Sequence, residues 1–261
     1  MWKRFAEANE TAALRSKDLS EPHEPPAQPA SPGREPIFNL PGAVTALAAV
    51  MVVIHLASTT VLNEDGLNQL YFWFAFHLQT LLDPQNQSFV LPLLWTPFTH
   101  AFLHGGWEHL VVNVAWLVIF ASPIVRRYGA LPMLAIFLVS AAAGAAAFAV
   151  TALYSGAYLI GASGGVAGLT GAAVRFIFQP VLYAKDPETG APIVLGRRLA
   201  TLRETFVNPR SRLFTLVWLL LNAAVPLAPL LIGASLGVAW QAHLGGFLAG
   251  FLMVGLFERR S

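Results

Sequence analysis

Six long apolar stretches limit what this chain can fold into. The hydrocarbon core of a bilayer is about 30 Å thick, and a helix needs roughly 20 apolar residues to cross it. The stretches that reach or approach this length are Ala43–Leu62, Glu108–Ile124, Leu131–Leu153, Ser163–Phe178, Leu213–Leu231 and Leu236–Phe257. Charged residues make up 11% of the chain, against about 25% in a soluble domain. The sequence therefore predicts an all-α membrane protein, a bundle of six transmembrane helices.

The positive charges predict how these helices are oriented. All 16 Lys and Arg residues lie in the first 34 residues, at 126–127, from 175 to 212, or at 259–260. Because short cytoplasmic loops carry the excess of Lys and Arg, both termini are predicted to be cytoplasmic. The net charge is only +2, and the basic residues form short clusters between apolar runs. Topology therefore explains them better than a nucleic-acid surface does, and no nucleic-acid partner is expected.

The chain is predicted to have three kinds of segment. Residues 1–40, rich in proline and charge, are expected to form a disordered cytosolic tail. Residues 41–257 would be the membrane domain, interrupted by a polar, basic cytosolic loop at 179–212. The long first outer loop, 63–107, contains an aromatic cluster that favours the membrane interface, so short interfacial helices are expected there. The chain has no cysteine, which excludes disulfides, thiol catalysis and Cys-ligated zinc.

Polar residues inside a membrane are energetically costly, so they are candidates for function. The first group is His109-Leu-Val-Val-Asn113, at the start of the second stretch. A spacing of four residues places both side chains on one helical face, where both can donate hydrogen bonds into one cavity. The alternative interpretation is a structural polar pair between helices.

The second group is Gly161-Ala-Ser163-Gly164-Gly165, at the start of the fourth stretch. The serine can be a helix N-cap or a packing residue. It can also be a nucleophile whose glycine neighbours let backbone and substrate approach. A helix N-terminus also presents free N–H groups to a developing oxyanion.

The third group lies in the sixth stretch, where His243, Gly246 and Gly250 share one helical face. Glycines let a membrane helix pack closely on another helix of small residues. Gly164 and Gly168 of the fourth stretch offer such a surface. That packing would bring the histidine within reach of the serine of the second group. A structural histidine is the alternative interpretation.

With these three groups in this order on the second, fourth and sixth helices, the chain resembles the rhomboid intramembrane serine proteases of the bacterial, six-helix type. The resemblance covers about residues 40–257. It implies that Ser163 is the nucleophile and His243 the general base. The implied oxyanion hole consists of His109, Asn113 and the backbone N–H of Ser163. The glycines that would shape the site are Gly161, Gly164, Gly246 and Gly250.

The resemblance also implies substrates and a location. Substrates would be single-pass or other transmembrane proteins in contact with membrane lipid, cleaved without a cofactor or metal. The protein would be a multi-pass protein of the plasma membrane, the bacterial inner membrane, with the site open to the outer side. A cap at Pro226–Ala239 and a lateral gate at Phe214 and Trp218 would control access.

The outer loop extends the similarity. The segment Thr99–His104 resembles the one before the second helix of the family, where His100 and His104 would be structural residues that hydrogen-bond the loop. The family often has Trp-Arg in this loop, and here the pair is Trp95-Thr96. Any loop contact that needs the arginine is therefore in doubt.

Other protein classes fit less well. A zinc metalloprotease needs His-Glu-x-x-His, and His100-Ala-Phe-Leu-His104 lacks the glutamate. An aspartyl intramembrane protease needs two aspartates within the membrane, and every aspartate lies outside the predicted helices. A channel or transporter would line the whole membrane depth with polar residues, whereas here they gather in the outer half. A non-catalytic rhomboid-like protein that binds transmembrane helices stays open, although nucleophile and base are both present.

Overall fold

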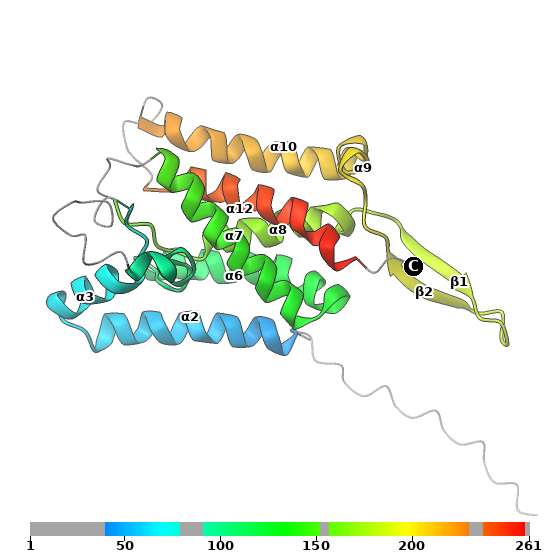
Figure 1. The fold of residues 1–261 in the computed structure, drawn as a ribbon. Coiled ribbons are helices and arrows are strands. Elements are labelled where there is room, and N and C mark those ends of the chain that lie inside the picture. The colour runs from blue at the N-terminus through cyan, green and yellow to red at the C-terminus, as the bar shows by residue number, and fades with distance from the viewer. Residues whose placement is uncertain (1–39, 79–90, 152–156, 230–236, 259–261) are drawn as a thin grey trace, which may run out of the picture. The chain divides into compact units, whose positions relative to one another are not determined.

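The computed structural model describes residues 40–78, 91–151, 157–229 and 237–258. Within these ranges the protein is a bundle of helices with one two-stranded hairpin (Figure 1). The longer helices are α2 (Gly42–Thr60), α6 (Trp107–Tyr128), α7 (Ala130–Thr151), α8 (Ser163–Ile177), α10 (Pro209–Ala224) and α12 (Trp240–Met253). The tail predicted for residues 1–40 lies outside the described residues, except for Leu40.

Among the described residues, four helices are long and apolar enough to cross a membrane by themselves. They are α2, α6, α7 and the 18-residue run formed by α12 with the 3-10 helix η5 (Val254–Phe257). Helices α8 and α10 have 15 and 16 residues, fewer than the roughly 20 that a perpendicular crossing needs. Large apolar side chains are more than half exposed on the outer faces of the bundle, among them Val53, Ile119, Leu220 and Leu256. An outer surface of this kind suits lipid rather than water.

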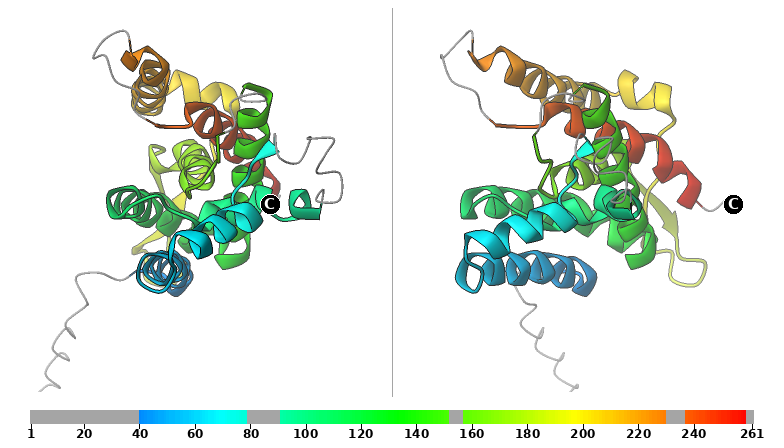
Figure 2. Two further views of the ribbon diagram at one scale, coloured as in Figure 1. Left: turned by 90° about the vertical axis from the view of Figure 1, so that its left-hand side faces the viewer. Right: turned by 60° about the vertical axis from the view of Figure 1, so that its left-hand side comes forward.

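Helix α8 lies at the centre of the bundle, with every residue from Gly164 to Phe176 buried. It packs against α12, α7 and α6 (Figure 2). On α12, Gly246 lies against the backbone of Gly164, and Gly250 lies against the backbone of Gly168. A Cβ atom on Gly250 would be 1.9 Å from the Gly168 carbonyl oxygen, so no larger residue fits. We call this backbone contact the glycine seam; it is the packing that the sequence predicts.

Helix α12 packs almost as closely on α7. A Cβ atom on Gly144 of α7 would lie 2.7 Å from the Ala242 carbonyl oxygen. A Cβ atom on Gly245 would lie 2.6 Å from the Cβ of Ala147. Small residues therefore hold α12 between α7 and α8, and they fix the position of its first turn.

The segment that links α8 to α10 is more ordered than the solvated loop expected for residues 179–212. It contains an antiparallel hairpin of β1 (Val181–Lys185) and β2 (Pro192–Arg197), followed by helix α9 (Leu202–Val207). In the turn of the hairpin, the Asp186 carboxylate accepts hydrogen bonds from two backbone N–H groups. Most of the strand residues are exposed, so the apolar–polar alternation that marks a strand in a sequence is missing.

Helix α10 starts four residues before the predicted stretch Leu213–Leu231 because a capping signal precedes it. The Asn208 side chain accepts hydrogen bonds from the N–H groups of Arg210 and Ser211, and Pro209 occupies the first helical position. The helix ends at Ala224 and continues as a 3-10 turn, η4 (Val225–Leu227). The cap predicted for residues 226–239 is described only at 226–229 and 237–239.

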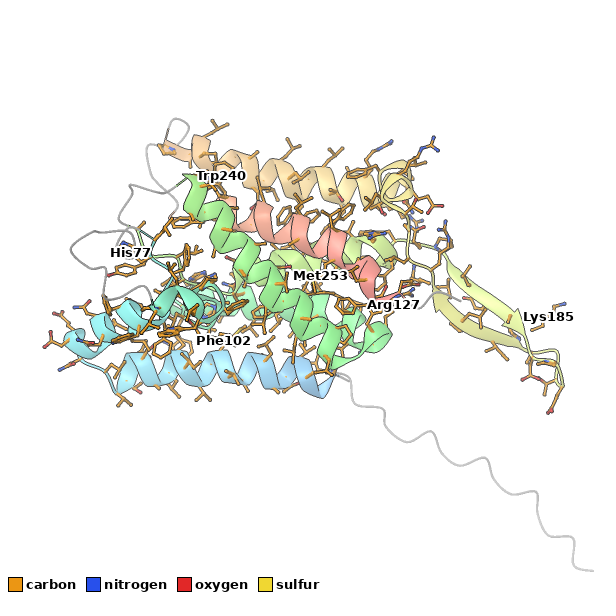
Figure 3. All side chains as sticks on the ribbon, viewed as in Figure 1. His77, Phe102, Arg127, Lys185, Trp240 and Met253 are labelled. Atoms are coloured by element: carbon orange, nitrogen blue, oxygen red, sulfur yellow. The ribbon has the colours of Figure 1, made fainter. Side chains whose placement is uncertain are left out.

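Polar contacts join the helices at the end of the bundle that is rich in basic residues. Figure 3 shows Arg127 and Lys185 at this end, opposite Trp240 and His77. Arg127 and Tyr128, at the end of α6, both bind the Glu258 carboxylate, at 2.6 and 2.7 Å. The buried Arg175 guanidinium donates to two backbone carbonyl oxygens, of Ala200 and of Phe251 near the end of α12. The far ends of α6, α8 and α12 are thus joined.

Replacing Gly250 with alanine is expected to destabilise the protein strongly. The new methyl group would overlap the Gly168 backbone, and overpacking typically costs about 1–3 kcal/mol. Because a helix backbone must move, we expect a loss of about 3 kcal/mol, measured by thermal unfolding in detergent. The control is Gly42→Ala, since nothing lies within 4 Å of the added atom. Equal melting temperatures for Gly250→Ala and the wild type would contradict the glycine seam.

Candidate active site

Ser163 is the first residue of α8 and is half-buried. The N–H groups in the first turn of a helix have no acceptor within the helix, so they are available to a negatively charged group at this helix end. The preceding residue, Ala162, is fully buried. The serine hydroxyl therefore lies at the positive end of a helix whose body is enclosed by the bundle.

Backbone hydrogen bonds hold the chain that leads into Ser163. Leu159 and Phe76 exchange two N–H···O bonds, at 2.9 and 3.1 Å. The Gly161 N–H donates to the His100 carbonyl oxygen at 2.9 Å. These contacts come from two separate parts of the segment between α2 and α6, so the start of α8 is fixed by residues far away in the sequence.

Gly161 is required for two independent reasons. Its φ of +113° lies in a region that L-residues rarely adopt. A Cβ atom there would also lie 2.6 Å from Cε1 and 2.7 Å from Nε2 of His109. The imidazole of His109, on the first turn of α6, therefore rests on the backbone two residues before Ser163.

Asn113 is buried one turn further along α6. Its Nδ2 donates to the His109 carbonyl oxygen at 2.9 Å. An amide nitrogen carries two hydrogens, so this bond uses one donor and leaves the other for the site. Asn113 thus lies one helical turn from His109, whose ring contacts Gly161 just before the start of α8.

His243 lies on the first turn of α12, beside the glycine seam. A Cβ atom on Gly164 would be 3.5 Å from the carbonyl oxygen of Ala242, so the residues next to this contact, Ser163 and His243, come from adjoining helix ends. The Nδ1 atom of His243 lies 2.7 Å from Oδ1 of Asn222. In the described part of the chain no hydrogen bond joins His243 to the Ser163 hydroxyl.

Asn222 contacts the candidate site but is not among the residues predicted from the sequence. It lies near the end of α10, and its amide contacts the imidazole of His243. A single asparagine within an apolar stretch was the available signal, because such a residue is costly in a membrane unless it is paired. The predicted gate residues lie on the same helix: Trp218 stacks on Phe247 of α12 at 4.5 Å, and Phe214 contacts Phe120 of α6.

The two histidines of the segment before α6 behave differently. His100 is buried and its Nδ1 bonds the Thr96 carbonyl oxygen at 3.0 Å, which is the structural role expected for it. His104 is also buried, but neither ring nitrogen has a hydrogen-bond partner of ordinary geometry among the described residues. Its ring instead lies 5.1 Å from that of His109.

The described residues hold no cluster of three or more His, Asp or Glu side chains suited to a metal ion. The polar groups that converge at this end of the bundle are a hydroxyl, two imidazoles and two amides. These groups can accept and donate protons and can stabilise an oxyanion, so the arrangement suits acyl transfer.

His100 and His104 predict how stability depends on pH. Burial lowers the pKa of His100 and of His104 to about 4, with neighbouring His109 and His55 contributing at His104. An exposed histidine in the unfolded chain has a pKa of about 6.5, so between these values only the unfolded state binds the proton. Stability should therefore fall as pH drops from about 6.5 to about 4, by up to about 1.4 kcal/mol per pH unit for each histidine.

The variant His104→Phe removes one of these two groups. Thermal unfolding in detergent across this window should therefore show a shallower loss for the variant than for the wild type. Parallel curves for the two proteins would contradict the buried neutral state of His104.

Comparison with known proteins identifies the family of this chain. The rhomboid domain model matches residues 92–260. RHOMBOID-like protein 5 of Arabidopsis thaliana is 26% identical over 160 residues, which are 61% of this chain and 42% of that protein. RHOMBOID-like protein 4 of the same plant is 28% identical over 163 residues, or 61% of this chain and 33% of that protein. The chain thus spans less than half the length of these relatives. Because the family match covers most of the chain and all three motif groups, the chain belongs to the rhomboid family, a family of helical membrane proteins that are typically intramembrane serine proteases.

Proposed function

We propose that this protein is an intramembrane serine endopeptidase that cleaves membrane proteins in or near their transmembrane segments with a Ser163–His243 pair. The observation that carries this proposal is the glycine seam. It packs the backbones of α8 and α12 against each other. The start of α8, which carries Ser163, therefore adjoins the first turn of α12, which carries His243.

The chemistry follows from the atoms available. Nε2 of His243 would take the proton of the Ser163 hydroxyl as Oγ attacks the peptide carbonyl carbon. The tetrahedral intermediate would collapse as the imidazolium returns that proton to the leaving amine. Water would then attack the acyl-enzyme with His243 again as base, releasing the new carboxyl group and restoring the serine. These steps use protons only, so no cofactor or metal enters the scheme.

Three donors would stabilise the oxyanion: the backbone N–H of Ser163, the ring of His109 and the amide of Asn113. Support comes from the imidazole resting on Gly161 and from the unused amide hydrogen of Asn113. The α8 N-terminus adds its free N–H groups to the same region.

The membrane arrangement is also a proposal. The six longer helices would be the six spans, with α8 starting below the surface because residues 157–162, which precede it, are packed against the outer loop. The basic end would be cytoplasmic, so the site would open to the opposite side of the plasma membrane. Substrates would be single-pass or other transmembrane proteins, entering past Phe214 and Trp218 of α10 beneath the cap at 226–239.

One observation favours a second candidate function, a rhomboid-like protein that binds transmembrane helices without cutting them. Within the described residues the imidazole of His243 is hydrogen-bonded to Asn222 and not to Ser163. Thr96 also stands where the family often has arginine. A protein of this second kind would still bind membrane helices, but it would leave them intact.

Replacing Ser163 or His243 with alanine should abolish cleavage. Loss of either member of such a pair typically lowers kcat by at least about 10³-fold. The assay uses the purified protein and a fluorescent single-span substrate, with thermal unfolding as the check on folding. The control is Ser122→Ala, because that hydroxyl bonds only a carbonyl of its own helix. Substantial cleavage by Ser163→Ala would exclude the serine mechanism, and uncut substrate with the wild type would favour the second candidate.

Replacing His109 or Asn113 with alanine should slow cleavage less severely. Removing one oxyanion donor typically costs ~10²–10³ in kcat, and we expect the lower end because two donors remain. KM should change little, since the lost bond forms mainly in the transition state. Steady-state kinetics on both variants check this. Full rates in both would remove the two residues from the oxyanion hole.

A further inference from the structure

We propose that Asn222 is a positioning residue that holds His243 in the tautomer and orientation needed for a general base. The proposal rests on the proposed serine protease function, and it turns the pair into a Ser-His-Asn arrangement. Its starting point is the hydrogen bond between Nδ1 of His243 and Oδ1 of Asn222, at 2.7 Å. That bond joins two helices, α12 and α10.

The second contact of the Asn222 amide determines which way the amide faces. Its Nδ2 donates to the Trp218 carbonyl oxygen, one turn earlier on α10, at 2.8 Å. The amide oxygen must therefore be the atom that faces the imidazole. A carbonyl oxygen can only accept a hydrogen bond, so Nδ1 of His243 is the donor and carries the proton.

This assignment fixes the state of the other ring nitrogen. A neutral imidazole protonated at Nδ1 has its lone pair on Nε2, and Nε2 is the atom that must take the serine proton. When the ring gains that proton, the bond from Nδ1 to Asn222 becomes charge-assisted and stronger. Asn222 would thus favour the correct tautomer before the reaction and stabilise the imidazolium during it.

An amide is well suited to this position. Asn222 is 9% exposed, near the end of an apolar helix, where an unpaired carboxylate would be costly. Both ends of the amide are hydrogen-bonded, one to a backbone carbonyl and one to the imidazole. The residue therefore orients His243 without burying a negative charge.

The packing of α10 on α12 holds Asn222 in place. The carbonyl of Trp218 fixes the amide, and the ring of Trp218 stacks on that of Phe247, with 4.5 Å between the ring centroids and 25° between the ring planes. Phe247 lies one turn beyond His243 on α12. The same two helices thus share an aromatic contact and the amide–imidazole bond, and the imidazole is oriented only while α10 stays docked on α12.

The test compares Asn222→Leu, which removes the acceptor, with Asn222→Asp, which keeps an acceptor oxygen. Thr215→Val is the matched control, a buried polar residue two turns earlier on α10 whose hydroxyl has no partner in the described structure. The readouts are kcat and KM across pH, and ¹⁵N NMR of histidine-labelled protein in detergent. His243 signals are assigned by their loss in His243→Gln.

For Asn222→Leu we expect kcat to fall about 10²-fold with KM unchanged, less than the ~10⁴-fold that follows loss of the charged member of a Ser-His-Asp triad. The acid limb of the kcat/KM profile should move to lower pH, and the Nδ1–H signal of His243 should weaken in favour of Nε2–H. Asn222→Asp should recover most of the rate, with its acid limb at higher pH because a carboxylate favours the imidazolium. Thr215→Val should match the wild type in every readout.

An unchanged tautomer and an unchanged acid limb in Asn222→Leu would overturn the proposal even if the rate fell, since a slower rate alone is what lost packing produces. If Asn222→Leu fails to fold, Asn222→Asp decides: an acid limb at the wild-type pH would count against the role. The proposed function is tested separately. If the wild type does not cleave the substrate, the proposed function is wrong. If Ser163→Ala loses cleavage while Asn222→Leu behaves like the wild type, only the role of Asn222 is refuted.

Discussion

The contact on which the rest of the structure depends is the meeting of two helix backbones along the glycine seam, where no side chain separates α8 from α12. In lipid, helices gain little from the hydrophobic effect and associate through close packing. Small residues therefore allow the helices of this bundle to associate closely, and they also determine how the helices align. Their spacing sets the register of the two helices, and the register decides that Ser163 and His243 come from adjoining ends. A single added methyl group at Gly246 or Gly250 would alter the packing and the site together.

A second feature recurs at several polar side chains in the apolar bundle. Asn113, His100 and Asn222 each bond the backbone carbonyl four residues earlier, as serine and threonine side chains do elsewhere in these helices. The polar group is thereby partly satisfied within its own helix or turn. In Asn113 and Asn222, the rest of the amide stays available to another side chain. A membrane protein can carry hydrogen-bonding groups in its interior in this way at tolerable energetic cost.

Those features that depend on a local sequence pattern could be predicted. Long apolar runs marked the helices, and glycines repeated at helical spacing marked the faces that meet. The family assignment, drawn from the motifs around Ser163 and His243, is confirmed by the rhomboid match. Two features could not be read this way. The hairpin at 181–197 has mostly exposed strands and hence no alternating pattern. The bond from Asn222 to His243 joins residues 21 apart on separate helices, and it is set by the packing of Trp218 on Phe247 rather than by any spacing.

The polar contacts at the C-terminal end of α12 limit how this helix can move within the bundle. Glu258 holds the end of this chain segment to Arg127 and Tyr128 of α6, and Arg175 of α8 binds the Phe251 carbonyl. A helix anchored there and interlocked with its neighbours through glycines cannot easily slide along them. Under the proposed mechanism, the hydroxyl of Ser163 and the imidazole of His243 would therefore be brought together by rotation about side-chain bonds rather than by movement of α12. Rotamer changes take picoseconds to nanoseconds when side chains are free to turn, whereas helix shifts take microseconds to milliseconds. The proposed pair would accordingly form without any rearrangement of the helices around it.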